Sequence, residues 1–209
     1  MRAKKVMVIH VKDDLEKEEL MKELQKLELP AFIYVHGKLN SLKINIQGTK
    51  DEIREAMEKV REIHHRVRSR LYPDRKGFYQ YNINDIFREA GVSISMPILT
   101  KTLELLGEHA DLRGDKLISS LSWGEIVNLV KKLGEILTDI SLQTTRQIRE
   151  VVAPISVTFG VDPQEVLELA VDFGVAEYKE DKFKYELVKN KEQAMEIMLK
   201  KLEGRGNED

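Results

Sequence analysis

The sequence predicts an α+β protein: a ferredoxin-like βαββαβ sandwich over residues 1–83, followed by a mainly helical region with two winged-helix-like units. Three observations support this fold class. In the first 83 residues, runs rich in Val and Ile alternate with segments whose apolar residues recur every three or four positions, as strands and helices require. The remaining residues have mainly helical periodicity. The net charge also changes sign near residue 82, which indicates two parts with different surroundings.

The N-terminal part contains six predicted elements in the order strand, helix, strand, strand, helix, strand. Asp13 is a suitable N-cap for the first helix. Thr49 followed by Glu52 matches a capping box, so the second helix should begin after Thr49. This order is that of the ferredoxin-like fold, which RNA-recognition modules share. The predicted strands cover residues 4–11, 31–35, 42–47 and 78–83.

The fourth strand decides between two resemblances. Without it, the segment LKINIQGTKDEIREAMEKVREI (residues 42–63) resembles the last strand and helix of a KH domain. The GXXG loop with which KH domains clamp the nucleotide backbone is missing, because Gly37-Lys38-Leu39-Asn40 is a different pattern that lies between two strands. The resemblance therefore implies the shape of a KH domain but not its clamp.

Residues 84–142 and 143–209 each show the order helix, helix, hairpin, helix, which resembles a winged-helix unit. The two stretches align at an offset of 66–69 residues, where Gly107 and Gly174 end corresponding helices. We therefore expect a duplicated winged-helix-like unit. The second copy should end in a disordered tail over Glu203–Asp209, which is rich in Gly and charge.

The helices of these units have the wrong charge for reading DNA. A reading helix needs Lys, Arg, Asn or Gln directed at phosphates and base edges. The first candidate helix offers Lys101 but also Glu104. The second offers Gln164 as its one suitable residue beside three acids, Glu165, Glu168 and Asp172. These acids would be repelled by a duplex. Protein contact or internal packing is the favoured role of both units.

The composition excludes several classes of protein. The chain has no Cys, which rules out disulfides, thiolate metal sites and cysteine nucleophiles. It contains no apolar stretch long enough to span a bilayer and no signal-peptide core at its start, so a cytoplasmic location is expected. Abundant Lys and Glu with few Asn and Gln are typical of a hyperthermophile.

The strongest functional signal is a basic run with interleaved aromatic residues at the end of the second predicted helix. Residues 1–81 have a net charge of +5, whereas residues 82–209 have −7. Such a run attracts a polyanion such as RNA through phosphate pairing and base stacking. The alternatives are a helix end matched to its dipole and contact with the acidic half of the same chain. The candidate nucleic-acid-binding residues are Arg61, His65, Arg66, Arg68, Arg70, Tyr72, Arg75, Lys76 and Tyr79.

A second candidate site is the face of the N-terminal sheet that points away from the helices. Strand alternation places aromatic, imidazole, amide and ammonium groups together on that face, where they could stack on bases and bond their edges. The competing and favoured interpretation is that the second half of the chain packs over it, because Val6, Val8 and Phe32 are apolar. The candidate residues are His10, Phe32, Tyr34, His36, Lys43 and Asn45.

The sequence predicts no catalytic residues, no cofactor and no metal site. It contains no P-loop, GxGxxG, GxSxG or HExxH motif. His64 and His65 are adjacent and therefore diverge on a helix. A site shared by His10 and His36 across neighbouring strands is the remaining alternative, although a histidine pair without a carboxylate is more often structural.

From KKVMVIHVKDD near its start to GTKDEIREAMEKVREI, the chain resembles an uncharacterised protein family of hyperthermophilic archaea. The resemblance implies a cytoplasmic location. It implies no activity and no site residue.

The residues favour a non-catalytic protein that binds RNA or a ribonucleoprotein. This hypothesis depends on guanidinium groups that stand free at the end of the long helix. The first alternative is an adaptor or assembly factor that binds only proteins, through its acidic C-terminal half or as a homodimer. The second is a small-molecule enzyme with a pocket between its domains.

Overall fold

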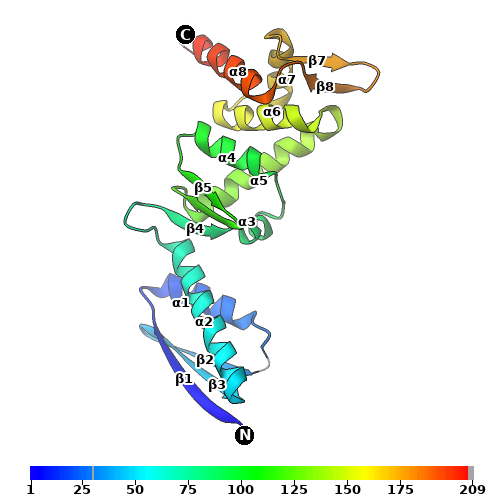
Figure 1. Cartoon of the computed structure of the whole chain (residues 1–209). Coiled ribbons are helices and arrows are strands. Elements are labelled where there is room, and N and C mark those ends of the chain that lie inside the picture. The colour runs from blue at the N-terminus through cyan, green and yellow to red at the C-terminus, as the bar shows by residue number, and fades with distance from the viewer. Residues whose placement is uncertain (30, 207–209) are drawn as a thin grey trace. The chain divides into compact units, whose positions relative to one another are not determined.

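The structure is a computed structural model that describes residues 1–29 and 31–206, and it divides into two compact units (Figure 1). Unit 1 covers Met1–Tyr81 and unit 2 covers Asn82–Asp209. Helices alternate with small antiparallel sheets along the chain, so the predicted α+β class is confirmed.

Unit 1 consists of one three-stranded sheet and two helices. In the sheet, β3 lies between β1 and β2 and is antiparallel to both. Leu42, Ile44 and Ile46 of β3 are buried, as their alternation with polar residues predicts. Figure 1 shows α2 running along this sheet. The elements are β1 (Ala3–His10), α1 (Asp14–Gln25), β2 (Phe32–Lys38), β3 (Ser41–Gly48) and α2 (Lys50–Leu71).

Both helices of unit 1 begin where the sequence predicts. The Asp13 side chain accepts a hydrogen bond from the Glu16 backbone N–H at 2.8 Å, which caps α1. At the start of α2, the Thr49 N–H donates to the Glu52 carboxylate at 2.7 Å. The Glu52 N–H donates to the Thr49 hydroxyl at 3.3 Å. The predicted capping box is therefore confirmed.

The predicted fourth strand does not belong to the sheet of unit 1. β4 (Tyr79–Asn82) forms a different three-stranded sheet, in the order β4-β6-β5, so the four-stranded ferredoxin-like prediction is wrong. The length of α2 gives the physical reason. Its 22 residues extend roughly 33 Å, longer than the roughly 27 Å of an eight-residue strand. The short segment after α2 therefore starts beyond the end of the sheet.

Unit 2 contains two successive runs of helix, helix, hairpin and helix, the order that the sequence predicts. A short 3₁₀ turn (η1, Ser141–Gln143) connects them. The winged-helix identity of these runs and their division at residue 142 stay predictions. The first run is α3 (Ile83–Ala90), α4 (Met96–Leu105), β5 (Ala110–Arg113), β6 (Lys116–Ser119) and α5 (Trp123–Ile140). The second is α6 (Arg146–Phe159), α7 (Pro163–Asp172), β7 (Ala176–Lys179), β8 (Lys184–Leu187) and α8 (Lys191–Arg205).

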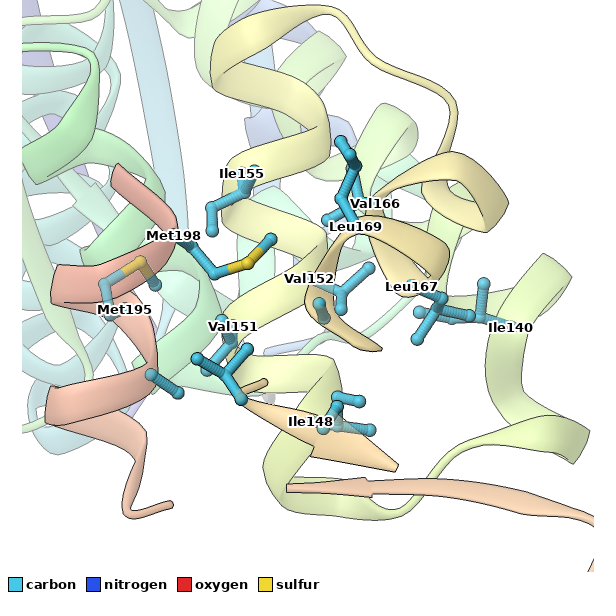
Figure 2. Packing of buried hydrophobic residues seen from close by; sticks show 14 residues of the cluster. Ile140, Ile148, Val151, Val152, Ile155, Val166, Leu167, Leu169, Met195 and Met198 are labelled. Atoms are coloured by element: carbon cyan, nitrogen blue, oxygen red, sulfur yellow. The ribbon is translucent and has the colours of Figure 1, made fainter. Parts of the chain in front are cut away.

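The centre of unit 2 is an apolar cluster built around α6. Figure 2 shows Met195 and Met198 of α8 facing the side of α6 that carries Val151 and Ile155. Residues of α7, including Val166 and Leu167, belong to the same cluster and are fully buried. Because its contributing side chains come from α5 through α8, this cluster joins the second run of elements to the end of the first.

The C-terminal tail is ordered further than the sequence predicts. α8 continues to Arg205, so the prediction of disorder is wrong for residues 203–205, whereas residues 207–209 lie outside the described residues. Lys201 and Arg205 place their cationic groups 5.3 and 5.1 Å from the centre of the Phe173 ring. These cation–π contacts hold the last turns of the helix against α7's C-terminal end.

Candidate nucleic-acid interface

The arginines at the end of α2 are paired with carboxylates of α1. Arg66 contacts Glu23 at 3.3 Å, and Arg70 contacts Glu19 at 3.0 Å. Arg68 Nε lies 3.0 Å from an oxygen of Glu16. The expectation that these guanidinium groups stand free in solvent is therefore wrong. Their partners come from the neighbouring helix of the same unit and not from the acidic half of the chain.

Glu16 is the centre of this ion-pair network, which we call the α1–α2 clasp. Its side chain is fully buried, and one oxygen accepts from both His64 Nε2 and Arg68 Nε, each at 3.0 Å. Its other oxygen accepts from the Lys12 backbone N–H at 2.7 Å. A buried carboxylate with this many donors is structural, because each donor replaces a water molecule that the charge loses on burial.

Tyr72, a predicted stacking residue, is also engaged by the start of α1. Its hydroxyl donates to Asp13 Oδ2 at 2.6 Å, and the Lys12 ammonium lies 4.4 Å from the centre of its ring. The hydrogen bond from Tyr72, followed by that from the Glu16 backbone, lowers the pKa of Asp13 below its ordinary value of 3.8. Burial and the Asp13 hydrogen bond raise the pKa of Tyr72. The hydroxyl and one face of the Tyr72 ring are therefore used within unit 1.

Four of the exposed basic residues that the sequence predicted lie outside the α1–α2 clasp. Arg61 and His65 lie on the outer side of α2, and Arg75 and Lys76 lie in the loop after it. Within the described residues, none of the three cations Arg61, Arg75 and Lys76 forms an ion pair. Asp74 shapes the loop by accepting from the Lys76 and Phe78 N–H groups at 2.8 and 3.0 Å. These bonds, led by that from Phe78, lower the pKa of Asp74.

Tyr79 does not join the face of the N-terminal sheet. It lies on β4, half-buried, and its ring stacks on Tyr81 with centroids 5.9 Å apart. The predicted basic run is therefore not one surface: the structure divides it among the α1–α2 clasp, the exposed side of α2, the loop after it and β4.

The predicted sheet face is brought together as expected from strand alternation. The register gives three cross-strand rows: Lys4–Gln47–Phe32, Val6–Asn45–Tyr34 and Val8–Lys43–His36. Phe32 is 69% exposed and Tyr34 56%. Lys43 and Asn45 of the central strand are half-buried between them and β1. We call this set of nine side chains, together with His10 and Lys38 at its end, the open face.

The open face has one sign of charge. β1, β2 and β3 contain four lysines and two histidines but no Asp or Glu, although the whole chain has 36 acidic residues. The acidic residues of unit 1 lie on its helices and in the segments beside them, where several pair with arginines. Sequence reasoning identified the aromatic residues of this face but overlooked Lys4, Lys38 and the missing carboxylates, which are visible in the three strand sequences alone.

His10 and His36 do not share a site. β3 separates their strands, and His10 lies opposite Ser41 whereas His36 lies opposite Lys43. The strand order therefore rules out a site shared across neighbouring strands. The described residues contain no group of three His, Cys, Asp or Glu side chains that could hold a metal ion. None of the helices in the described part of the chain has both the length and the apolar character needed to cross a membrane.

These observations define a two-unit α+β protein with a cationic, aromatic sheet face. The chain belongs to the family of uncharacterized proteins conserved in archaea called DUF2067, whose model matches residues 9–196. No curated protein matches the chain.

One solved structure was found among the similar chains: the crystal structure of the a/eIF2alpha-aDim2p-rRNA complex from Pyrococcus horikoshii OT3. The sequence identity is 17%, and the match covers 64% of this chain and 85% of the other. The TM-score of 0.17 is too low for this likeness to define a fold or a function.

Proposed function

We propose that this protein is a non-catalytic RNA-binding protein that holds single-stranded RNA on the open face of unit 1. The observation that carries the proposal is the exposure of Phe32 and Tyr34 on a sheet face whose three strands lack any carboxylate. An aromatic ring in water is available for stacking on a base, and neighbouring lysines are available for phosphates.

The spacing of the two rings fits an extended strand of RNA. Phe32 and Tyr34 are two residues apart on β2, which separates them by roughly 7 Å along the strand. Bases that stack on both rings must therefore be unstacked from each other, as in a single strand and not in a duplex. Asn45 and Gln47, one in each of the two rows concerned, supply amide donors and acceptors for base edges.

The α1–α2 clasp is not part of the proposed RNA site. Replacing Arg66, Arg68 and Arg70 by Glu would break ion pairs inside unit 1, so a loss of binding in that variant would not distinguish contact from unfolding. Arg75 and Lys76 are retained as possible phosphate contacts, since both are exposed and form no ion pair within the described residues.

The test is the binding of the full-length protein to a labelled single-stranded RNA of about a dozen nucleotides, compared with a duplex of the same length. The variants Phe32→Ala and Tyr34→Ala should each raise Kd about 5- to 100-fold. Phe183→Ala is the matched control, because Phe183 is an aromatic residue with 73% exposure in unit 2. Absence of binding at about 50 mM salt, or equal effects of all three variants, would contradict the proposal.

The second candidate function is protein binding through the same sheet, favoured by Val6 and Val8. These two residues lie on the edge strand β1 and are 48% and 55% exposed. An apolar edge strand can pair with a strand of a partner or of a second copy. If Val6→Lys reduces self-association in sedimentation, the edge strand is a protein interface; unchanged self-association would contradict this second candidate.

The two runs of elements in unit 2 are, in this proposal, winged-helix-like modules that bind protein. The acidic residues on α7 support protein contact over duplex binding, because Glu165, Glu168 and Asp172 would repel phosphates.

A further inference from the structure

Unit 2 contains a pocket of about 480 Å³ at the junction of its two runs of elements. Its walls come from the segment before α4, the C-terminal part of α5 and the first turns of α6. The volume is within the range of small-molecule sites. Val92, Ile94, Ile98 and Leu137 form an apolar part of the wall, and Arg146 and Arg149 stand at its polar end.

Two arginines, Arg146 and Arg149, and one carboxylate, that of Glu150, line the polar end of the pocket. α6 begins with Arg146 and has no acidic residue in its first turn, and its N-cap Thr145 makes no side-chain capping bond. Cations at a helix N-terminus are repelled by the helix dipole, which favours anions there. The two arginines near the N-terminus of α6 therefore lie where the helix dipole ordinarily disfavours positive charge.

Arg149 has no carboxylate partner within the described residues. It is half-buried, and its Nε donates to the backbone carbonyl of Thr145 at 3.3 Å. The nearby Glu150 is engaged elsewhere, because Lys191 lies 2.5 Å from its carboxylate. Glu150 also lies 3.7 Å from Arg146, whose side chain is 83% exposed. Arg149 thus lines the pocket without an ion pair of its own within the described residues, because the carboxylate of Glu150 in the same wall pairs with Lys191 and Arg146. Its partial burial makes a counter-charge favourable.

We propose that this pocket binds a small organic anion in which one phosphate or carboxylate group is attached to an apolar body. The anionic group pairs with Arg149, the exposed Arg146 and the N-terminus of α6, and the apolar body contacts Ile94, Ile98 and Leu137. This proposal does not depend on the RNA-binding function, which is assigned to unit 1.

The experiment uses the full-length protein and three probes: phenyl phosphate, inorganic phosphate and benzyl alcohol. Phenyl phosphate at about ten times its Kd should raise Tm by about 3–5 °C. It should also shift the methyl NMR signals of Ile94 and Ile98. Inorganic phosphate should bind at least about tenfold more weakly, since it lacks the apolar part. In a parallel titration, phenylacetate replaces phenyl phosphate. The probe with the lower Kd shows whether the site prefers a carboxylate or a phosphate group.

Arg149→Gln should weaken phenyl phosphate binding about tenfold or more while leaving RNA affinity unchanged. Arg88→Gln is the matched control, because Arg88 is an exposed arginine of unit 2 outside the pocket. If phenyl phosphate leaves the Ile94 and Ile98 signals unchanged, or if the two variants bind it equally well, the anion site is wrong. Tighter binding of benzyl alcohol than of phenyl phosphate would also overturn it, since the pocket would then be merely apolar.

Discussion

Glu16 shows how a single residue sets the function that the basic helix end can perform. A carboxylate buried without donors would be highly unfavourable, and Glu16 obtains them from His64, Arg68 and the Lys12 backbone. Arg68 therefore satisfies an internal charge through Nε, although its side chain stays 50% exposed. Local charge counts overstate the free positive charge of α2 for this reason.

Glu16→Gln should destabilise unit 1 by about 1–3 kcal/mol, the range for charged hydrogen bonds with one partner removed. The matched control is Glu62→Gln, because Glu62 is an exposed residue whose ion pair within the described residues is with Lys59 on the same helix. Its effect should be below about 0.5 kcal/mol. Urea unfolding of both variants measures the difference. Equal stabilities of the two variants would show that the clasp contributes nothing.

Tyr72→Phe should change the acid dependence of stability through Asp13. Because folding lowers the pKa of Asp13, its contribution is present above the ordinary value of 3.8 and is lost as pH falls through the lower folded value. Without the Tyr72 hydroxyl, the folded pKa should move back up toward 3.8. An NMR titration of the Asp13 carboxyl gives this value directly. An unchanged pKa in Tyr72→Phe would show that the hydroxyl is not the cause.

The partners of the α2 arginines were within reach of sequence reasoning. Glu16, Glu19 and Glu23 are spaced by three and four residues, so they share one face of α1. The sequence predicts two helices on the same side of a sheet, and an acidic face on one with a basic face on the other indicates pairing. What spacing alone does not give is which arginine meets which acid.

At the scale of elements, α5 contains two glycines with opposite roles. A Cβ added at Gly134 would lie 2.8 Å from Cγ1 of Val92, whereas one at Gly124 would meet nothing within 4 Å. Gly134 is therefore required for the close approach of α5 to the segment before α4. Gly124 only lowers the helix propensity of the first turn.

Gly134→Ala should destabilise the protein by about 1–3 kcal/mol through overpacking. Gly124→Ala, its control in the same helix, should stabilise it by up to about 1 kcal/mol. The double variant Gly134→Ala with Val92→Ala should lose less free energy of unfolding than the sum of the losses in the two single variants, because the two sites are in contact. Additive effects in thermal unfolding would mean that Val92 is not the obstacle.

Helix starts are predictable from the sequence, but strand pairing is not. α2 begins after Thr49, as its capping box predicts, because a cap is a local signal. β4 was recognised as a strand from its alternation, yet its partner is β6. Alternation reports that one face of a strand is buried and does not report against what. The same limit explains the separation of His10 and His36, since β1 and β2 pair with β3 and not with each other.

At the scale of the whole molecule, the two units have net charges of opposite sign. Residues 1–81 have a net charge of +5. Within unit 1 the charge is also unevenly distributed, because the carboxylates lie on the helices and beside them and the sheet has none. The strands of the open face therefore carry positive charge with no carboxylate among them. The net charge of −7 over residues 82–209 would repel a polyanion.

The salt dependence of RNA binding tests this division of charge. If Lys4, Lys38 and Lys43 contact phosphates, log K should fall with log salt with a slope of about −2, since each phosphate contact on a single strand contributes about −0.7. Lys43→Ala should make the slope shallower by about 0.7. Tyr34→Ala should lower the affinity at every salt concentration without changing the slope, because stacking releases no counterions. A slope steeper than about −5 would require more cations than the open face provides, and would show that exposed cations outside it, such as Arg61, Arg75 and Lys76, also contact the RNA.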